Sequence, residues 1–129
     1  MKKLAIIILA ALCVCSCASN HTPSDNAAEL RFKDGKFKIA QFTDIHLHPE
    51  DPKSGPVADT LLAVLERERP DLVVMTGDIV TRRPAEKGWR YIMDMMAKAG
   101  IPYAVTMGNH DPENMERDSI YNILAADPL

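Results

Sequence analysis

Three short polar clusters in this chain contain residue types that bind metal ions. The first is Asp44-Ile45-His46, the second is Gly77-Asp78, and the third is Gly108-Asn109-His110-Asp111. Aspartate, histidine and asparagine offer the oxygen and nitrogen ligands that divalent and trivalent ions accept. The clusters follow one another at intervals of about thirty residues, the length of one strand-plus-helix unit. This combination predicts a metal site built from three successive loops.

Apolar runs precede the three clusters and predict three parallel strands, over residues 36–42, 72–75 and 103–107. The run at 72–75 contains no polar residue, which is typical of a parallel strand buried on both faces. Because the carboxyl ends of parallel strands meet at one edge of a sheet, the three clusters are expected to lie together there.

Amphipathic helices are predicted between these strands. Apolar residues recur at helical spacing in both connections, at Ala58, Leu61, Leu62 and Leu65 and again at Trp89, Ile92, Met93 and Met96. Pro70 stops the first helix, and Gly100 is a natural C-cap for the second. At that spacing the methionines indicate core packing rather than a soft-metal site. A last helix is predicted to begin with Asp111 or a close neighbour as its cap and Pro112 in its first position.

The domain is expected to begin with a hairpin, because Asp34-Gly35 separates two alternating runs, Leu30–Lys33 and Lys36–Ile39. The whole order is then βαβαβα with parallel strands after an N-terminal hairpin. A sheet of three strands keeps an open edge that a complete domain normally covers. We therefore expect residues 29–129 to form a partial α/β domain, truncated at its C-terminus.

The first 16 residues have the pattern of a lipoprotein signal peptide. Lys2 and Lys3 precede an apolar stretch, Leu4 to Val14, that is too short to span a bilayer. Val14-Cys15-Ser16-Cys17 resembles a bacterial lipobox, which implies lipid attachment at Cys17 and a place in the bacterial cell envelope, outside the inner membrane. An ordinary secretory signal cut nearby is the alternative. Residues 17–28 are expected to form a flexible tether.

The amino-acid composition limits which side chains could bind metal ions and which partners the protein could have. The three cysteines all lie within the first 17 residues, so the domain's metal ions must be held by oxygen and nitrogen. The formal net charge is −3, and cleavage of the leader would remove two lysines and no acid. Nucleic-acid binding needs a basic face, so no nucleic-acid partner is expected. The negative charge does not argue against a small phosphorylated substrate, because bound metal ions would reverse the local field.

Each cluster taken singly also has an ordinary explanation. An aspartate at a strand end often makes a turn, and Gly-Asp is a common turn dipeptide. Gly108-Asn109 fits a turn and Asp111 fits a helix cap, but His110 then has no explanation. The joint order and spacing, with every cluster at the end of a predicted strand, favour the functional interpretation.

As a set, the three clusters resemble the first three motif blocks of the calcineurin-like metallophosphoesterase superfamily. The flanking residues Gln41–Leu47 and Thr76–Val80 resemble its purple-acid-phosphatase-related branch. The resemblance extends roughly from Phe37 to Asp111. It implies that this chain is the N-terminal half of an α/β sandwich, in which two packed sheets are flanked by helices.

The resemblance also implies a metal ligand set and a reaction. Asp44 and His46 would bind the first of two divalent or trivalent ions, with Mn, Fe and Zn as candidates. Asp78 would bridge both ions, and Asn109 would bind the second. The pair would lower the pKa of a shared water, and the resulting hydroxide would attack phosphorus in line with the ester oxygen.

Two further residues are implied to act in catalysis. His110 would be the general acid toward the leaving oxygen or a charge stabiliser, and Asp111 would orient its ring. His48, two residues beyond a ligand, is expected to be a loop residue, with support of the site as the alternative. Arg82 and Arg83 are expected to be solvated, with contact to substrate phosphate as the alternative.

The chain departs from the family pattern in two places. Thr81 stands where the purple enzymes have a tyrosine, so a tyrosinate–iron bond is not expected. The later Gly-His-x-His block of the family has no counterpart in this sequence. The resemblance thus implies a phosphoester hydrolase, with phosphomonoesters as the expected substrates. The alternatives are a phosphodiesterase or nucleotidase on the same metal core, and a non-catalytic envelope lipoprotein with a degenerate metallophosphoesterase fold.

Overall fold

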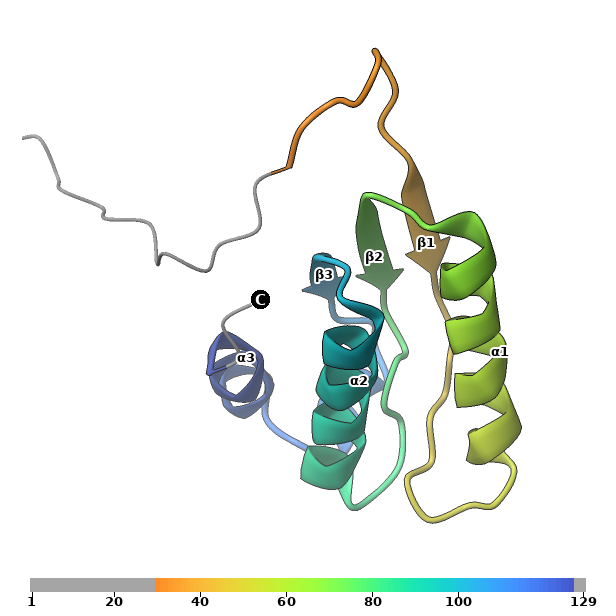
Figure 1. Ribbon diagram of the computed structural model, residues 1–129. Coiled ribbons are helices and arrows are strands. Elements are labelled where there is room, and N and C mark those ends of the chain that lie inside the picture. The colour runs from red at the N-terminus through yellow and green to blue at the C-terminus, as the bar shows by residue number, and fades with distance from the viewer. Residues whose placement is uncertain (1–29, 127–129) are drawn as a thin grey trace, which may run out of the picture.

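The computed structural model describes residues 30–126, and the expected signal peptide and tether lie outside these residues. Three strands form a parallel sheet in the order β1-β2-β3: β1 (Ile39–Phe42), β2 (Leu72–Thr76) and β3 (Tyr103–Thr106). Figure 1 shows the three arrows pointing the same way, so that all the loops that leave their carboxyl ends emerge at one edge. The predicted α/β class with parallel strands is confirmed.

The two connecting helices lie on the same face of the sheet. They are α1 (Ser54–Glu68) and α2 (Ala85–Ala99), both in front of the strands in Figure 1. Right-handed crossovers that each move one strand in the same direction place their helices on one side. Both helices end on a left-handed residue, Arg69 (φ 45°) after α1 and Gly100 (φ 63°) after α2. The C-cap predicted at Gly100 is thereby confirmed.

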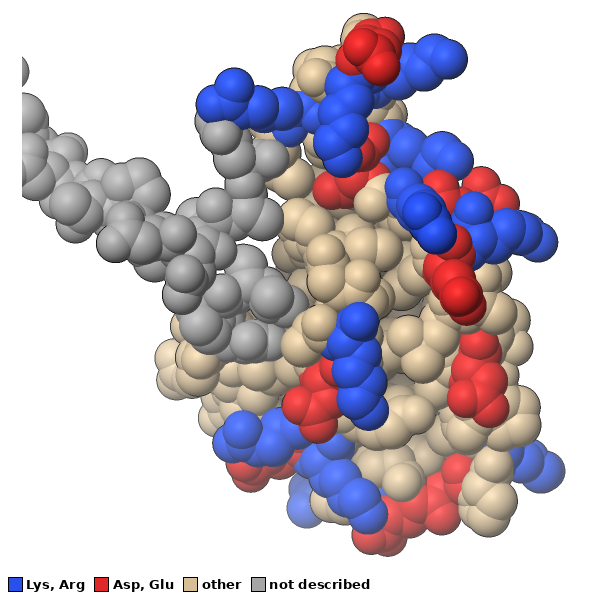
Figure 2. Space-filling model, viewed as in Figure 1, with Lys and Arg blue, Asp and Glu red and all other residues tan. Residues whose placement is uncertain are grey.

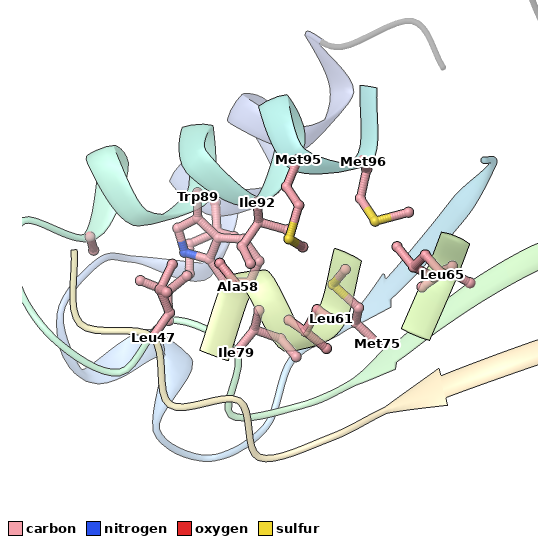
Figure 3. Packing of buried hydrophobic residues seen from close by; sticks show 14 residues of the cluster. Leu47, Ala58, Leu61, Leu65, Met75, Ile79, Trp89, Ile92, Met95 and Met96 are labelled. Atoms are coloured by element: carbon pink, nitrogen blue, oxygen red, sulfur yellow. The ribbon is translucent and has the colours of Figure 1, made fainter. Parts of the chain in front are cut away.

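The hydrophobic core fills the space between these helices and the sheet. Val73 and Met75 of β2 are 0% exposed and face Ala58, Leu61 and Leu65 of α1 and the apolar stripe of α2. Figure 3 shows Trp89, Ile92, Met95 and Met96 pointing from α2 into this layer. Met96 is therefore a core residue, as its spacing predicted, and Met93 is also buried (8% exposed), whereas Met95 was not part of that prediction.

The opposite face of the sheet is open among the described residues. Ile39 is 55% exposed, and Leu72 and Val74 are only half-buried. The prediction that residues 72–75 are buried on both faces is therefore wrong for the part of the chain that the structure describes. The reason is topological, because both crossovers deliver their helices to the other side.

The last helix begins later than predicted. Residues Asp111–Glu113 form a single 3-10 turn, η1, and the helix α3 (Arg117–Ala125) starts after Glu116. Asp111 does not cap a helix, because its carboxylate is occupied by the loop that follows β2. α3 packs against α2 and contributes Ile120, which is fully buried, to the core.

The predicted hairpin is reduced to a tight turn. Lys33 and Lys36 exchange two backbone hydrogen bonds of 2.9 Å around Asp34 (φ 51°) and Gly35 (φ 73°). Asp71 fixes this segment to the start of β2, because its carboxylate accepts hydrogen bonds from the Lys33 ammonium (2.9 Å) and the Lys38 backbone N–H (2.8 Å). The hydrogen bond from Lys33 lowers the pKa of the Asp71 carboxyl.

Basic and acidic side chains are interspersed over the face of the molecule in Figure 2. Ion pairs on the surface include Lys38 with Glu68 and Arg90 with Glu86. Within residues 30–126, none of the helices combines the length and the apolar character that crossing a membrane requires.

Candidate metal centre

The loops that leave β1 and β2 run side by side and are joined by backbone hydrogen bonds. The N–H of Asp44 donates to the carbonyl of Gly77 (3.0 Å), and that of His46 donates to the carbonyl of Asp78 (2.9 Å). A third bond of 2.8 Å joins Leu47 to Ile79. The first two clusters are thus held in a fixed register beyond the end of the sheet.

The three candidate ligands in these loops all have left-handed backbone conformations. Asp44 has φ 54°, His46 has φ 48° and Asp78 has φ 53°. This region costs a residue with a side chain about 1 kcal/mol or more, although aspartate and histidine tolerate it better than most. Such strain is concentrated at functional sites, where the surrounding contacts hold it in place. Here the backbone bonds between the two loops supply that support.

The side chains of these three residues converge. Asp44, His46 and Asp78 each offer a ligand atom, and the three atoms lie within 4.8 Å of one another. Nε2 of His46 is 3.7 Å from Oδ1 of Asp44. The side chains of Asp44 and His46 are 63% and 48% exposed, whereas Asp78 lies at the base of the cluster with 9% exposure. Two carboxylates and one imidazole suit a borderline or hard ion such as Zn, Mn or Fe.

The third cluster lies against the second because the backbones of Gly77 and Gly108 are in close contact. A Cβ on Gly77 would lie 2.8 Å from Cα of Gly108, and a Cβ on Gly108 would lie 2.6 Å from the backbone nitrogen of Asp78. The backbone N–H of His110 donates to Oδ1 of Asp78 (3.0 Å). Asn109, which is exposed, lies between Gly108 and His110. The loop that carries the fourth predicted ligand therefore borders the cluster, at the edge that the parallel topology predicted.

His110 lies next to the candidate ligands. The centroids of the His46 and His110 rings are 6.0 Å apart. Nδ1 of His110 lies 2.8 Å from Oε1 of Glu113, one turn of backbone later. A carboxylate accepts at Nδ1–H, which leaves Nε2 of His110 for another partner. Glu113 is not among the residues predicted from the sequence, and its i,i+3 spacing from His110 is the signal that could have identified it.

Asp111 has a different place from the one predicted. It is 0% exposed, and its carboxylate accepts four backbone N–H groups, from Asp78 (2.8 Å), Ile79 (2.8 Å), Val80 (2.9 Å) and Gly108 (2.8 Å). Both oxygens are thus directed at the loops after β2 and β3, and the His110 ring has Glu113 as its partner. The expectation that Asp111 orients that ring is corrected. Asp111 instead joins the second cluster to the third.

The remaining residues named from the sequence, His48, Arg82 and Arg83, lie outside the cluster of Asp44, His46 and Asp78. His48 is in the loop before α1, where its N–H donates to the Ser54 hydroxyl (3.0 Å) and its ring is 3.8 Å from Asp51. Arg82 and Arg83 are exposed, and the Arg82 guanidinium lies near the carbonyl of Thr81 (3.4 Å).

Three curated proteins from different organisms are similar to this chain. A protein of Psychrobacter arcticus named probable cyclic nucleotide phosphodiesterase is 33% identical over 103 residues, covering 69% of this chain and 36% of that protein. Phosphatase DCR2 of Saccharomyces cerevisiae is 36% identical over 97 residues, covering 62% of this chain and 17% of that protein. Probable inactive purple acid phosphatase 28 of Arabidopsis thaliana is 33% identical over 103 residues, covering 66% of this chain and 26% of that protein. The chain thus spans about a third or less of the length of these relatives.

A family model matches a larger part of the chain. The model described as calcineurin-like phosphoesterase aligns with residues 37–128, which include all three polar clusters. This match confirms the resemblance found in the motifs, and the three-stranded α/β arrangement is consistent with part of that family's fold. The purple acid phosphatase name among the relatives agrees with the branch indicated by the flanking residues. The chain belongs to the calcineurin-like phosphoesterase family.

Proposed function

We propose that this chain supplies the first part of a dinuclear metal centre in a phosphoester hydrolase. The observation that carries the proposal is the convergence of Asp44, His46 and Asp78 within 4.8 Å, with His110 beside them. Membership of the calcineurin-like phosphoesterase family supports a metal-dependent phosphoesterase. Because the chain spans about a third or less of its relatives, the complete activity is proposed for the whole protein.

We assign each candidate residue a role in metal binding or proton transfer from its position in the site. Asp44 and His46 would hold one ion, Asp78 would share its two oxygens between both ions, and Asn109 would give its amide oxygen to the second. When bound, a pair of such ions would neutralise phosphoryl oxygens and acidify a water. His110 would hold the proton that passes to the leaving oxygen, because its Nε2 is left free by the contact of Nδ1 with Glu113.

Phosphomonoesters are the proposed substrates, and diesters or nucleotides are the second candidate. The relative named phosphatase DCR2 favours the first class, and the relative named probable cyclic nucleotide phosphodiesterase favours the second. Comparing kcat/KM for an aryl phosphate and a bis-aryl phosphate in the whole protein ranks these classes. A non-catalytic protein is the third candidate, favoured by the relatives named probable inactive purple acid phosphatase.

Asp78→Asn tests the metal centre directly. A neutral amide bridges two cations poorly, so the substitution should abolish paired-metal binding. Calorimetric titration of the whole protein with Mn²⁺ or Zn²⁺ should show two bound ions in the wild type and the loss of paired binding in the variant. Asp94→Asn, on the exposed surface of α2, is the matched control and should bind as the wild type does. Equal binding by the Asp78 variant, or none by the wild type, would refute the proposal.

The metal-loaded protein is expected to lack a visible tyrosinate–iron band. Thr81 occupies the position of the purple enzymes' tyrosine, and a threonine hydroxyl cannot form the phenolate bond that gives the colour. An absorption spectrum of the iron-loaded protein checks this. A purple band would show that another tyrosine reaches the ion.

A further inference from the structure

Thr81 contacts His46, a candidate metal ligand of the first cluster. The residue follows Val80, which pairs with Leu47 in a parallel bridge just beyond the first two clusters. Thr81 is 4% exposed, and its Oγ1 lies 3.2 Å from Nδ1 of His46. A buried hydroxyl is therefore in hydrogen-bonding contact with the candidate histidine ligand.

The two ring nitrogens of His46 consequently have different surroundings. Nδ1 faces Thr81, and Nε2 lies 3.7 Å from Oδ1 of Asp44, on the side of the carboxylates. A neutral imidazole has one N–H and one free lone pair. If Nδ1 carries the proton and donates it to the Thr81 hydroxyl, the lone pair of Nε2 is directed toward the cluster.

Thr81 is itself held in place. Its carbonyl accepts a hydrogen bond of 3.0 Å from Nδ2 of Asn114, which lies between η1 and α3. Its β-branched side chain has few accessible rotamers, so the position of the hydroxyl is well defined once the backbone is fixed. The third loop thus supports the residue that touches the ligand of the first loop.

We propose that Thr81 is a positioning residue that fixes the tautomer and ring orientation of His46, with Nε2 toward the metal. The inference rests on the proposed function for the presence of a metal, and it concerns a residue of this chain that would not touch the ion. Partners of this kind typically change metal affinity by about 10- to 100-fold when they are removed.

The test compares three threonine variants of the whole protein by calorimetric titration with Mn²⁺ or Zn²⁺. Thr81→Val keeps the shape and removes the hydroxyl, and it should weaken the first binding step by about 10- to 100-fold. Thr81→Ser keeps the hydroxyl and should bind nearly as the wild type does. Thr60→Val removes a hydroxyl from the exposed surface of α1, where it donates to the Pro56 carbonyl, and should leave affinity unchanged.

A second measurement needs no metal. Long-range ¹H–¹⁵N correlation spectra of the metal-free chain, at a pH where the ring is neutral, report which nitrogen of His46 is protonated. The wild type and Thr81→Ser should show the proton on Nδ1, and Thr81→Val should show mixed tautomers. A proton on Nε2 in the wild type, or equal metal affinity in Thr81→Val and the wild type, would overturn the inference. If the wild type binds no metal, the proposed function fails, and the spectra still decide the role of Thr81.

Discussion

Asp111→Ala is expected to destabilise the fold by about 3 kcal/mol or more, because each buried N–H left without a partner costs about 1–3 kcal/mol. Three buried backbone N–H groups lose their acceptor together, those of Asp78, Ile79 and Val80, and so does the half-buried N–H of Gly108. The loops after β2 and β3 would then separate, so metal binding should weaken as well. Urea unfolding followed by circular dichroism measures the first effect, and calorimetric titration with Mn²⁺ measures the second.

A smaller change keeps this prediction testable if the alanine variant does not fold. Asp111→Asn retains one carbonyl oxygen but places an NH₂ group against backbone donors, so it should also lower the unfolding midpoint. Asp94→Asn, an exposed change on α2, should stay within about 0.5 kcal/mol of the wild type. Wild-type midpoints for both Asp111 variants would mean that the four hydrogen bonds do not hold the loops.

His110→Ala should lower turnover by about 10²- to 10⁴-fold while leaving the metal content close to that of the wild type. The reason is that only the backbone N–H of His110 contacts the candidate ligand Asp78, and alanine keeps that N–H. The ring itself contacts Glu113 and lies 6.0 Å, between centroids, from His46. Steady-state hydrolysis of an aryl phosphate by the metal-loaded whole protein, with metal analysis of the same sample, checks both parts.

Glu113→Gln refines this assignment. The glutamine oxygen can still accept from Nδ1–H of His110, so the loss of turnover should be much smaller than for His110→Ala. Loss of both metal ions in His110→Ala would show that the ring is a ligand rather than a proton donor. Unchanged turnover in that variant would show that the leaving oxygen is protonated by another group.

The amino-acid sequence determined the local elements and their order. Local patterns predict these elements, because each pattern depends only on residues that are close in the chain. The patterns are the apolar run at residues 72–75 in β2, the helical spacing in α1 and α2, and the Asp34-Gly35 turn. The sequence also determined the edge at which the site forms, because parallel strands bring the residues that follow them to one side. Asp44, His46 and Asp78 therefore meet where their spacing predicted.

Three features were decided only by the tertiary structure. Asp111 was predicted to orient a ring, and Asp111 or a close neighbour was predicted to cap a helix. Asp111 instead lies under the loop of residues 78–80, which is more than thirty residues away in the chain. The contacts of Thr81 with His46 and with Asn114 likewise join distant segments. The open face of the sheet follows from both crossovers turning the same way. Short-range patterns do not encode such features, because each depends on where loops from separate strand–helix units come to rest against one another.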